Sequence, residues 1–193
     1  MAANTKDIID FLFEAGQLKK VQRTGEYLLN LKEGDTVAHH SFRAAIIGYF
    51  LSKMEGADTE QVVLTCLFHD FTEARITDVH KVAQRYIDIE KAEMVSFKEQ
   101  LSKLPKQLSE ELYYLFDNYR TDRSIEGVVA KDAELLETAM QAKEYLEEGR
   151  KDAYDWIKNV KSILKTASAK KLLAQIEKTK STDWWKGLKK IHR

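Results

Sequence analysis

The pattern of apolar positions along the chain is typical of helices. Apolar residues recur three and four positions apart, and no stretch shows the apolar–polar alternation that marks a strand. The chain has one proline, Pro105, and most of its eight glycines fall where an apolar stripe ends. The sequence therefore predicts an all-α fold. The expected helices cover residues 5–15, 36–56, 58–70, 82–101, 108–119, 124–148, 151–166 and 168–180.

The helix expected over residues 36–56 carries a histidine on its apolar side. His40 begins a stripe that continues through Ala44, Ile47 and Leu51, at the spacing of one helical face. This stripe predicts that His40 is buried.

Composition indicates an ordinary globular protein. Hydrophobic residues make up 44% and charged residues 32% of the 193 residues, and we find no internal repeat, so one domain is the simplest account. No apolar run approaches the roughly 18 residues that a membrane span needs, and residues 1–7 lack the features of a secretory signal. The single cysteine, Cys66, cannot form an internal disulfide, which agrees with a cytoplasmic location.

The net charge is zero, but the charge is distributed unevenly. Between residues 156 and 193, eleven lysines and arginines stand against only Glu177 and Asp183. Such a segment can bind nucleic acid or an anionic surface. Because Ile157 and Val160 begin a helical apolar stripe within it, we expect instead a solvated helix that docks on the acidic remainder of the fold.

Four residues on three predicted helices carry the candidate chemistry. His69 and Asp70 follow the apolar run 62–68, where a carboxylate is costly to bury unless it is paired or bound to a metal. Asp132 lies on the apolar stripe of a later helix, so its carboxylate also needs a partner. Together with His40 they would form a site of two histidines and two aspartates, which suits a divalent transition ion and leaves positions open for water and substrate.

Two further residues extend this hypothesis to hydrolysis of a phosphate ester. Glu73 follows Asp70 by three residues and is a candidate general base or general acid. Arg23 can hold a phosphate through two N–H groups. Taken singly, each residue has an ordinary alternative as a core histidine, a helix cap or half of an ion pair. Cys66 is expected to be a small core residue rather than a nucleophile.

The blocks of sequence around these residues resemble those of the HD-domain phosphohydrolases, and most of all the 5′-deoxynucleotidases and their relatives. The similar blocks are residues 17–25, 36–41, 67–73 and 132–137, and the likeness runs from residue 11 to residue 148. The resemblance implies one helical HD domain over residues 1–193. In this reading, residues 151–193 form basic C-terminal helices that pack on the core.

The resemblance also implies a role for each residue. The metal ligands would be His40, His69, Asp70 and Asp132. Glu73 would assist proton transfer, and Arg23 would orient the phosphate. Substrate contacts would come from Arg23, Thr24, Asp70, Asp78, Val79, His80, Lys81 and Asp132. The implied cofactor is one divalent ion among Co, Mn, Zn, Ni, Fe and Mg. The implied reaction releases phosphate from 5′-deoxynucleoside monophosphates, and the common state of the family implies a homodimer.

Three positions depart from the family pattern. His39 stands where the family has glutamate before the first ligand histidine, so it is a second group near the metal, a surface residue or an alternative ligand. Thr24 follows Arg23 where some relatives carry a tryptophan near the arginine that helps exclude ribonucleotides, which leaves the choice of sugar open. His80 lies in the stretch that contacts the nucleotide, where it adds a second metal or faces solvent.

The leading interpretation is a cytoplasmic, metal-dependent phosphohydrolase of nucleoside monophosphates, without a membrane or nucleic-acid partner. One alternative is another HD enzyme, such as a diesterase, a triphosphohydrolase or a hydrolase of a signalling nucleotide. The other is a non-catalytic protein with a structural metal, in which residues 156–193 and the pair Trp184–Trp185 bind nucleic acid.

Overall fold

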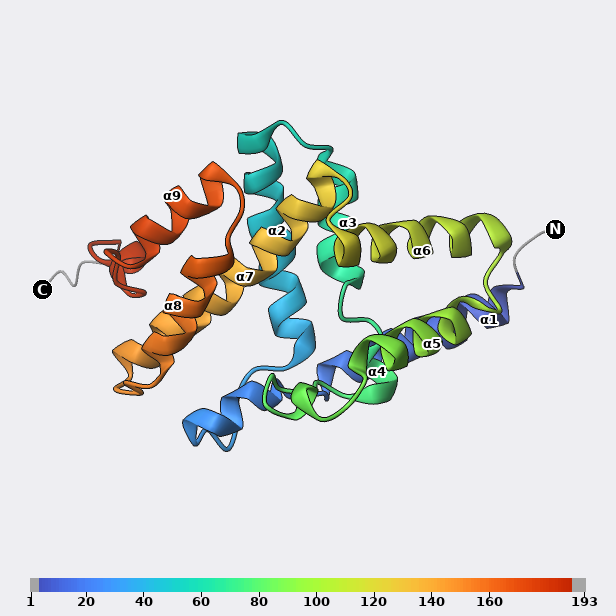
Figure 1. Cartoon of the computed structure of the whole chain (residues 1–193), viewed down its shortest axis with the longest axis horizontal. Coiled ribbons are helices and arrows are strands. Elements are labelled where there is room, and N and C mark those ends of the chain that lie inside the picture. Colours follow the sequence, from blue (N-terminus) through green and yellow to red (C-terminus); the bar gives the residue numbers. More distant parts are fainter. Residues whose placement is uncertain (1–3, 189–193) are drawn as a thin grey trace, which may run out of the picture.

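The computed structural model describes residues 4–188, and this region is built from nine α-helices joined by 3₁₀ turns and loops (Figure 1). The helices are α1 (Thr5–Ala15), α2 (Val37–Glu55), α3 (Thr59–Phe68), α4 (Glu73–Ile76), α5 (Ile89–Leu101), α6 (Lys106–Thr121), α7 (Ile125–Glu147), α8 (Ala153–Ile163) and α9 (Ala167–Ile176). Within this region no strand forms, and the single isolated β-bridge joins Gln22 to Thr36. The predicted all-α class is confirmed.

Three helices, α2, α3 and α7, form the centre of the fold (Figure 1). The end of α2 lies beside the start of α3, where the Ser52 hydroxyl donates to the Thr59 hydroxyl. The two helices therefore run antiparallel. Gly48 permits their close crossing, since a Cβ at this position would lie 2.9 Å from the Sγ atom of Cys66. This packing brings the end of α3 against the first turns of α2, where His40 lies.

A second apolar cluster lies on the side of α5 and α6. It contains Leu18, Val37, Phe71, Phe97, Leu101 and Phe116. Phe71 follows α3 directly, so this cluster holds the segment after α3 against α5 and α6.

The basic C-terminal helices pack on α7 at the end of the molecule opposite α1 (Figure 1). Ile157 and Leu173 are buried there, while Lys161 pairs with Glu177 at 2.9 Å and Lys165 with Asp122 at 2.6 Å. Trp184 and Trp185 are 76% and 51% exposed. The residues 189–193 of the basic segment, and residues 1–3, lie outside the described region. No helix between residues 4 and 188 is long and apolar enough to cross a membrane.

The helix predicted over residues 82–101 begins later than expected. Asp88 accepts a hydrogen bond from the backbone N–H of Lys91 at 3.1 Å, so it caps the helix and α5 starts at Ile89. Residues 83–85 form a separate 3₁₀ turn. The chain between α4 and α5 is therefore a loop, which leaves it free to approach Arg23 and Thr24.

Candidate metal and phosphate site

His40 and His69 meet where the start of α2 faces the end of α3. Both side chains are buried, and their Nε2 atoms lie 3.3 Å apart. The Nδ1 atom of His69 lies 2.8 Å from the carbonyl oxygen of Cys66, and that of His40 contacts the carboxylate of Glu137. Because each Nδ1 faces an acceptor, each neutral ring carries its proton there and presents a lone pair at Nε2.

Asp70 completes this group from the chain that follows α3. Its Oδ2 atom lies 3.1 Å from Nε2 of His69 and 3.8 Å from Nε2 of His40. Arg23 donates to the same oxygen through Nη1 at 3.1 Å. Burial acts to raise the pKa of Asp70, but His69 and Arg23 outweigh it and hold the pKa well below its usual value. The carboxylate is therefore ionised.

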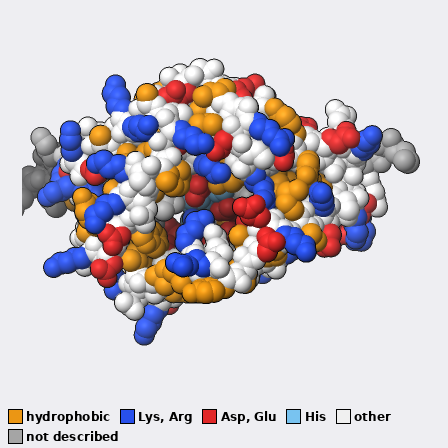
Figure 2. All heavy atoms as spheres, viewed as in Figure 1, with side chains coloured by type: hydrophobic (Ala, Val, Ile, Leu, Met, Phe, Trp, Pro, Cys, Tyr) orange, Lys and Arg blue, Asp and Glu red, His pale blue; other side chains and the backbone are white. Residues whose placement is uncertain are grey.

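The three side chains fit a divalent metal ion. One ligand atom from each of His40, His69 and Asp70 lies within 4.8 Å of the other two. Two imidazole lone pairs and a carboxylate oxygen suit transition ions such as Mn, Fe, Co, Ni or Zn. Burial acts to lower the pKa of His69, but Asp70 raises it above its usual value, so a proton competes with the metal for Nε2. On the face of the molecule that Figure 2 shows, acidic side chains gather in a recess near the middle.

Glu73 opens α4 beside this group. Its Oε2 atom is buried and has no hydrogen-bond partner within the described residues. Burial raises the pKa of Glu73 well above its usual value, and the carboxylates of Asp70 and Asp78 raise it further. A raised pKa favours the protonated carboxyl group, which can give a proton to a leaving oxygen.

Asp132 does not join this group. Its carboxylate accepts hydrogen bonds from the backbone N–H groups of Lys165 and Thr166, at 3.1 and 2.7 Å, and from the hydroxyl of Thr166 at 2.7 Å. These donors lie at the start of α9. The buried carboxylate of Asp132 therefore finds its partners in the C-terminal helices, on the side of α7 away from the histidines.

Glu134, two residues further along α7, faces the site instead. Its negative charge contributes to raising the pKa of His69 and of Arg23, and its Oε2 atom lies 3.4 Å from the hydroxyl of Tyr119. The Tyr119 ring in turn packs on the ring of His69. Residues two apart point to opposite sides of a helix, whereas Glu134 shares a face with Glu137, which holds His40. The spacing of three from Glu137 points to Glu134 only once the structure shows that Glu137 holds His40.

The stretch expected to contact the nucleotide lies beside Arg23. Thr24 donates through its backbone N–H to the carboxylate of Asp78 and through its hydroxyl to the carbonyl oxygen of Asp78 at 3.1 Å. His80 donates its backbone N–H to the Thr24 hydroxyl at 3.0 Å. Asp78 thus holds the loop against Arg23, and Asp78 also raises the pKa of Arg23.

The remaining residues of this stretch have local partners. The Nδ1 atom of His80 accepts from the backbone N–H of Ala83 at 3.2 Å, and the Val79 carbonyl accepts from Gln84 at 2.6 Å. Lys81 is exposed and donates to Gln84 at 3.0 Å. His80 lies outside the group of possible metal ligands found in residues 4–188.

His39 is a capping residue. Its side chain is 66% exposed, and its Nδ1 atom accepts the backbone N–H of Thr36 at 3.3 Å in a capping box at the start of α2. Of the three readings open for His39, the surface reading agrees with this position.

Cys66 is a core residue, as expected. Its side chain is 1% exposed, and burial raises the pKa of its thiol well above the usual value.

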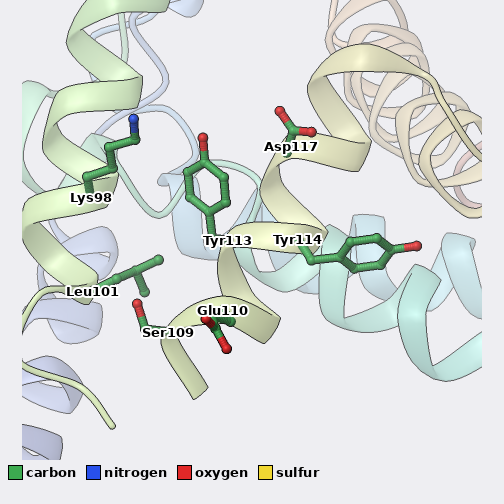
Figure 3. A pocket seen from close by; sticks show the side chains of 7 residues that line it. All are labelled: Lys98, Leu101, Ser109, Glu110, Tyr113, Tyr114 and Asp117. Atoms are coloured by element: carbon green, nitrogen blue, oxygen red, sulfur yellow. The ribbon is translucent and has the colours of Figure 1, made fainter. Parts of the chain in front are cut away.

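A cavity of about 410 Å³ lies elsewhere, between α5 and α6 (Figure 3). Lys98 and Leu101 line it from α5, and Tyr113, Tyr114 and Asp117 are among its lining residues on α6. It contains none of the residues around His40 and His69, so we place the chemistry in the histidine group and not in this cavity.

The comparisons with known proteins agree with this geometry. A family described as HD domain matches residues 15–177, from the end of α1 to the end of α9. The chain belongs to the HD-domain family, and the sequence-based assignment to it is confirmed.

Curated relatives carry a more specific name. The 5′-deoxynucleotidase HDDC2 of Bos taurus is 32% identical over 142 residues, which cover 72% of this chain and 68% of that protein. The 5′-deoxynucleotidase HDDC2 of Homo sapiens is 30% identical over 145 residues, with 72% and 69% covered.

Solved structures share the fold. A conserved hypothetical protein from Pyrococcus furiosus has a TM-score of 0.75 at 28% identity, covering 89% of this chain and 99% of that one. A predicted coding region from Archaeoglobus fulgidus has a TM-score of 0.67 at 30% identity, covering 93% and 99%.

Proposed function

We propose that this protein is a metal-dependent hydrolase that removes the 5′-phosphate from nucleoside monophosphates, with deoxynucleotides as the first substrates to test. The observation that carries the proposal is the convergence of His40, His69 and Asp70 beside Arg23 and Glu73. It combines a site for a cation, a fixed positive charge and a carboxyl group that can move a proton.

The metal ligands we propose are His40, His69, Asp70 and Glu134. When bound there, a divalent ion supplies positive charge that acidifies water and polarises the phosphoryl group. Glu134 takes the place that the sequence alone suggested for Asp132, because its charge acts on His69 and Arg23 while Asp132 is engaged by Lys165 and Thr166.

Arg23 and Glu73 would act on the phosphate itself. Arg23 already donates to Asp70, so a phosphate bound beside Asp70 lies within reach of its guanidinium group. In hydrolysis the oxygen of water bonds to phosphorus and the bond from phosphorus to the 5′-oxygen breaks. Glu73 can give its proton to that 5′-oxygen, which leaves as a hydroxyl group, and the proton that the attacking water releases restores the Glu73 carboxyl group.

The substrate class rests on the relatives and on the loop beside Arg23. The loop containing Asp78, Val79, His80 and Lys81 lies next to Arg23 through its bonds to Thr24, where a nucleoside attached to the phosphate would extend. Thr24 is smaller than tryptophan, so this edge of the site offers more room around the sugar. The ratio of ribonucleotide to deoxynucleotide hydrolysis therefore measures how strongly this loop discriminates between the two sugars.

The experiment incubates metal-stripped protein with 5′-deoxy- and ribonucleoside monophosphates and adds Co²⁺, Mn²⁺, Mg²⁺ or Zn²⁺ singly while released phosphate is measured. Asp70→Ala and Glu73→Gln run beside the parent protein, with Arg123→Ala, whose side chain is 71% exposed, as a control. Metal-dependent release that is lost in Asp70→Ala and kept in Arg123→Ala supports the proposal. Absence of release with every ion contradicts it, and triphosphates, diesters and oligonucleotides would then be offered.

We also propose that the protein is a homodimer that uses the outer face of α2, and that it acts in the cytoplasm. Large apolar side chains line this face without cover from the described residues: Phe42, Ile46, Tyr49, Phe50 and Met54 are between 44% and 65% exposed. A helix with apolar residues on all sides is normally buried, and contiguous apolar patches on a monomer are small. A two-fold axis would bring the same aromatic patch of two copies together.

The proposed cytoplasmic location rests on Cys66 being the single cysteine of the chain.

A further inference from the structure

Arg43 lies one turn after His40 on α2 and uses all three nitrogens of its guanidinium group. Its Nε atom donates to Oε1 of Glu137 at 3.0 Å. Its Nη1 atom donates to the two carboxylate oxygens of Glu144 at 2.8 and 2.9 Å, and Nη2 donates to Gln141 at 2.8 Å. The acceptors lie three and four residues apart, on one face of α7.

Glu137 is the partner that links this arginine to the metal site. Its side chain is 4% exposed, Oε1 is held by Arg43, and Oε2 contacts Nδ1 of His40. The carboxylate therefore has one oxygen for the arginine and one for the imidazole. A shift of Arg43 moves the group that determines the orientation of the His40 ring.

The two histidines differ in this respect. His69 has its Nδ1 atom on the backbone carbonyl of Cys66, which α3 holds in place without help from a side chain. His40 depends on a side chain of another helix, and an isolated buried carboxylate would be costly without a positive partner. A group that hydrogen-bonds the outer nitrogen of a ligand histidine commonly changes metal affinity about 10–100-fold when it is removed.

We propose that Arg43 is a positioning residue of the metal centre, which orients the His40 imidazole toward the ion by fixing Glu137 against α7. Neither Arg43 nor Glu137 touches the substrate in this scheme. The inference rests on the proposed metal-dependent function. It adds a residue 94 positions from its partner in sequence as a determinant of metal affinity.

The test compares Co²⁺ binding to metal-stripped protein by titration calorimetry and by the visible absorption spectrum of the bound Co²⁺. The variants are Arg43→Met, which keeps the apolar stem, and Arg43→Lys, which keeps the charge but loses the fork. The control is Lys143→Met, because Lys143 forms an ion pair at 3.1 Å with Glu147 on the same helix without touching Glu137. Circular dichroism establishes that each variant is folded.

We expect the Kd for Co²⁺ to rise about tenfold in Arg43→Met and several-fold in Arg43→Lys, with a changed absorption spectrum, while Lys143→Met stays within about twofold of the parent. An unchanged Kd and spectrum in Arg43→Met would overturn the inference and leave the proposed function standing. Absence of Co²⁺ binding by the parent protein would overturn both. If Arg43→Met does not fold, Arg43→Lys alone tests the inference, because it keeps a charge beside Glu137. An unchanged Kd for Co²⁺ in Arg43→Lys would then overturn the inference.

Discussion

The Nε2 atoms of His40 and His69 face each other at 3.3 Å, although the two residues belong to different helices and each ring has its Nδ1 atom on an acceptor. Two nitrogen lone pairs that point at one another repel unless a proton or a cation lies between them. The fold thus places two basic atoms at short range beside the ionised Asp70, and a metal ion there stabilises the contact between α2 and α3.

Removal of a ligand should abolish stabilisation by metal. We expect added Co²⁺ to raise the unfolding temperature of the parent protein, since an ion that binds only the folded state at 100 times its Kd contributes about 2.7 kcal/mol. In His40→Ala and Asp70→Ala this increase should vanish, because the group of three ligand atoms is incomplete. Differential scanning calorimetry with and without Co²⁺ measures it. A full metal-induced shift in His40→Ala would mean that the ion binds elsewhere.

Glu134 and Asp132 should have opposite effects. Glu134→Gln should weaken Co²⁺ binding about tenfold or more and leave folding nearly unchanged, because the side chain faces His69 and Arg23. Asp132→Asn should keep the metal affinity but lower the free energy of unfolding by about 2 kcal/mol, since a charged acceptor of several hydrogen bonds is lost at the start of α9. Calorimetric titration and urea unfolding of both variants separate the two effects. The reverse pattern would restore Asp132 as the ligand.

Glu26 should make stability depend on pH. Its side chain is buried, it accepts from the Tyr145 hydroxyl and from the backbone N–H of Asp35, and burial raises its pKa above the usual value. A carboxyl group with a raised pKa in the folded state contributes stability that is fully present below its unfolded pKa, about 4.3, and is lost as the pH rises through the folded pKa. Glu26→Gln removes this titration, so the stability of the variant relative to the parent should increase as the pH rises from 4 toward neutrality. Urea unfolding at a series of pH values measures the difference, and a difference that does not change with pH would rule out a raised pKa at Glu26.

A charge on the outer face of α2 should dissociate the proposed dimer. Phe42 is 65% exposed, and burying a phenylalanine in an interface stabilises it by about 1.5–3 kcal/mol. Phe42→Glu should therefore raise the dimer dissociation constant at least tenfold, as about 1.4 kcal/mol corresponds to a factor of ten. Sedimentation velocity over a range of concentrations measures the dissociation constant. Leu108→Glu, an exposed apolar residue of α6, is the control and should leave it unchanged, whereas a monomeric parent protein would contradict the dimer.

The sequence by itself determined the class of fold and the first part of the site. Apolar residues at helical spacing, one proline and glycines at helix ends are local properties, and they sufficed to predict the all-α fold. The buried position of His40 followed from its stripe on one helix. The pair His69–Asp70 and Glu73 could be proposed together because they lie within five consecutive residues, which keeps them close whatever the rest of the molecule does.

Only the tertiary structure decided which acidic residue of α7 faces the histidines and what holds them. Asp132 and Glu134 are both acidic residues of the same helix, and the rotation of α7 about its axis, set by packing against α2, α8 and α9, selects Glu134 for the site. The partnership of Arg43 with Glu137 joins residues 94 positions apart and could not be read from either segment alone. Helical periodicity places residues on the faces of one helix, but the contacts between helices depend on how side chains from distant segments pack together.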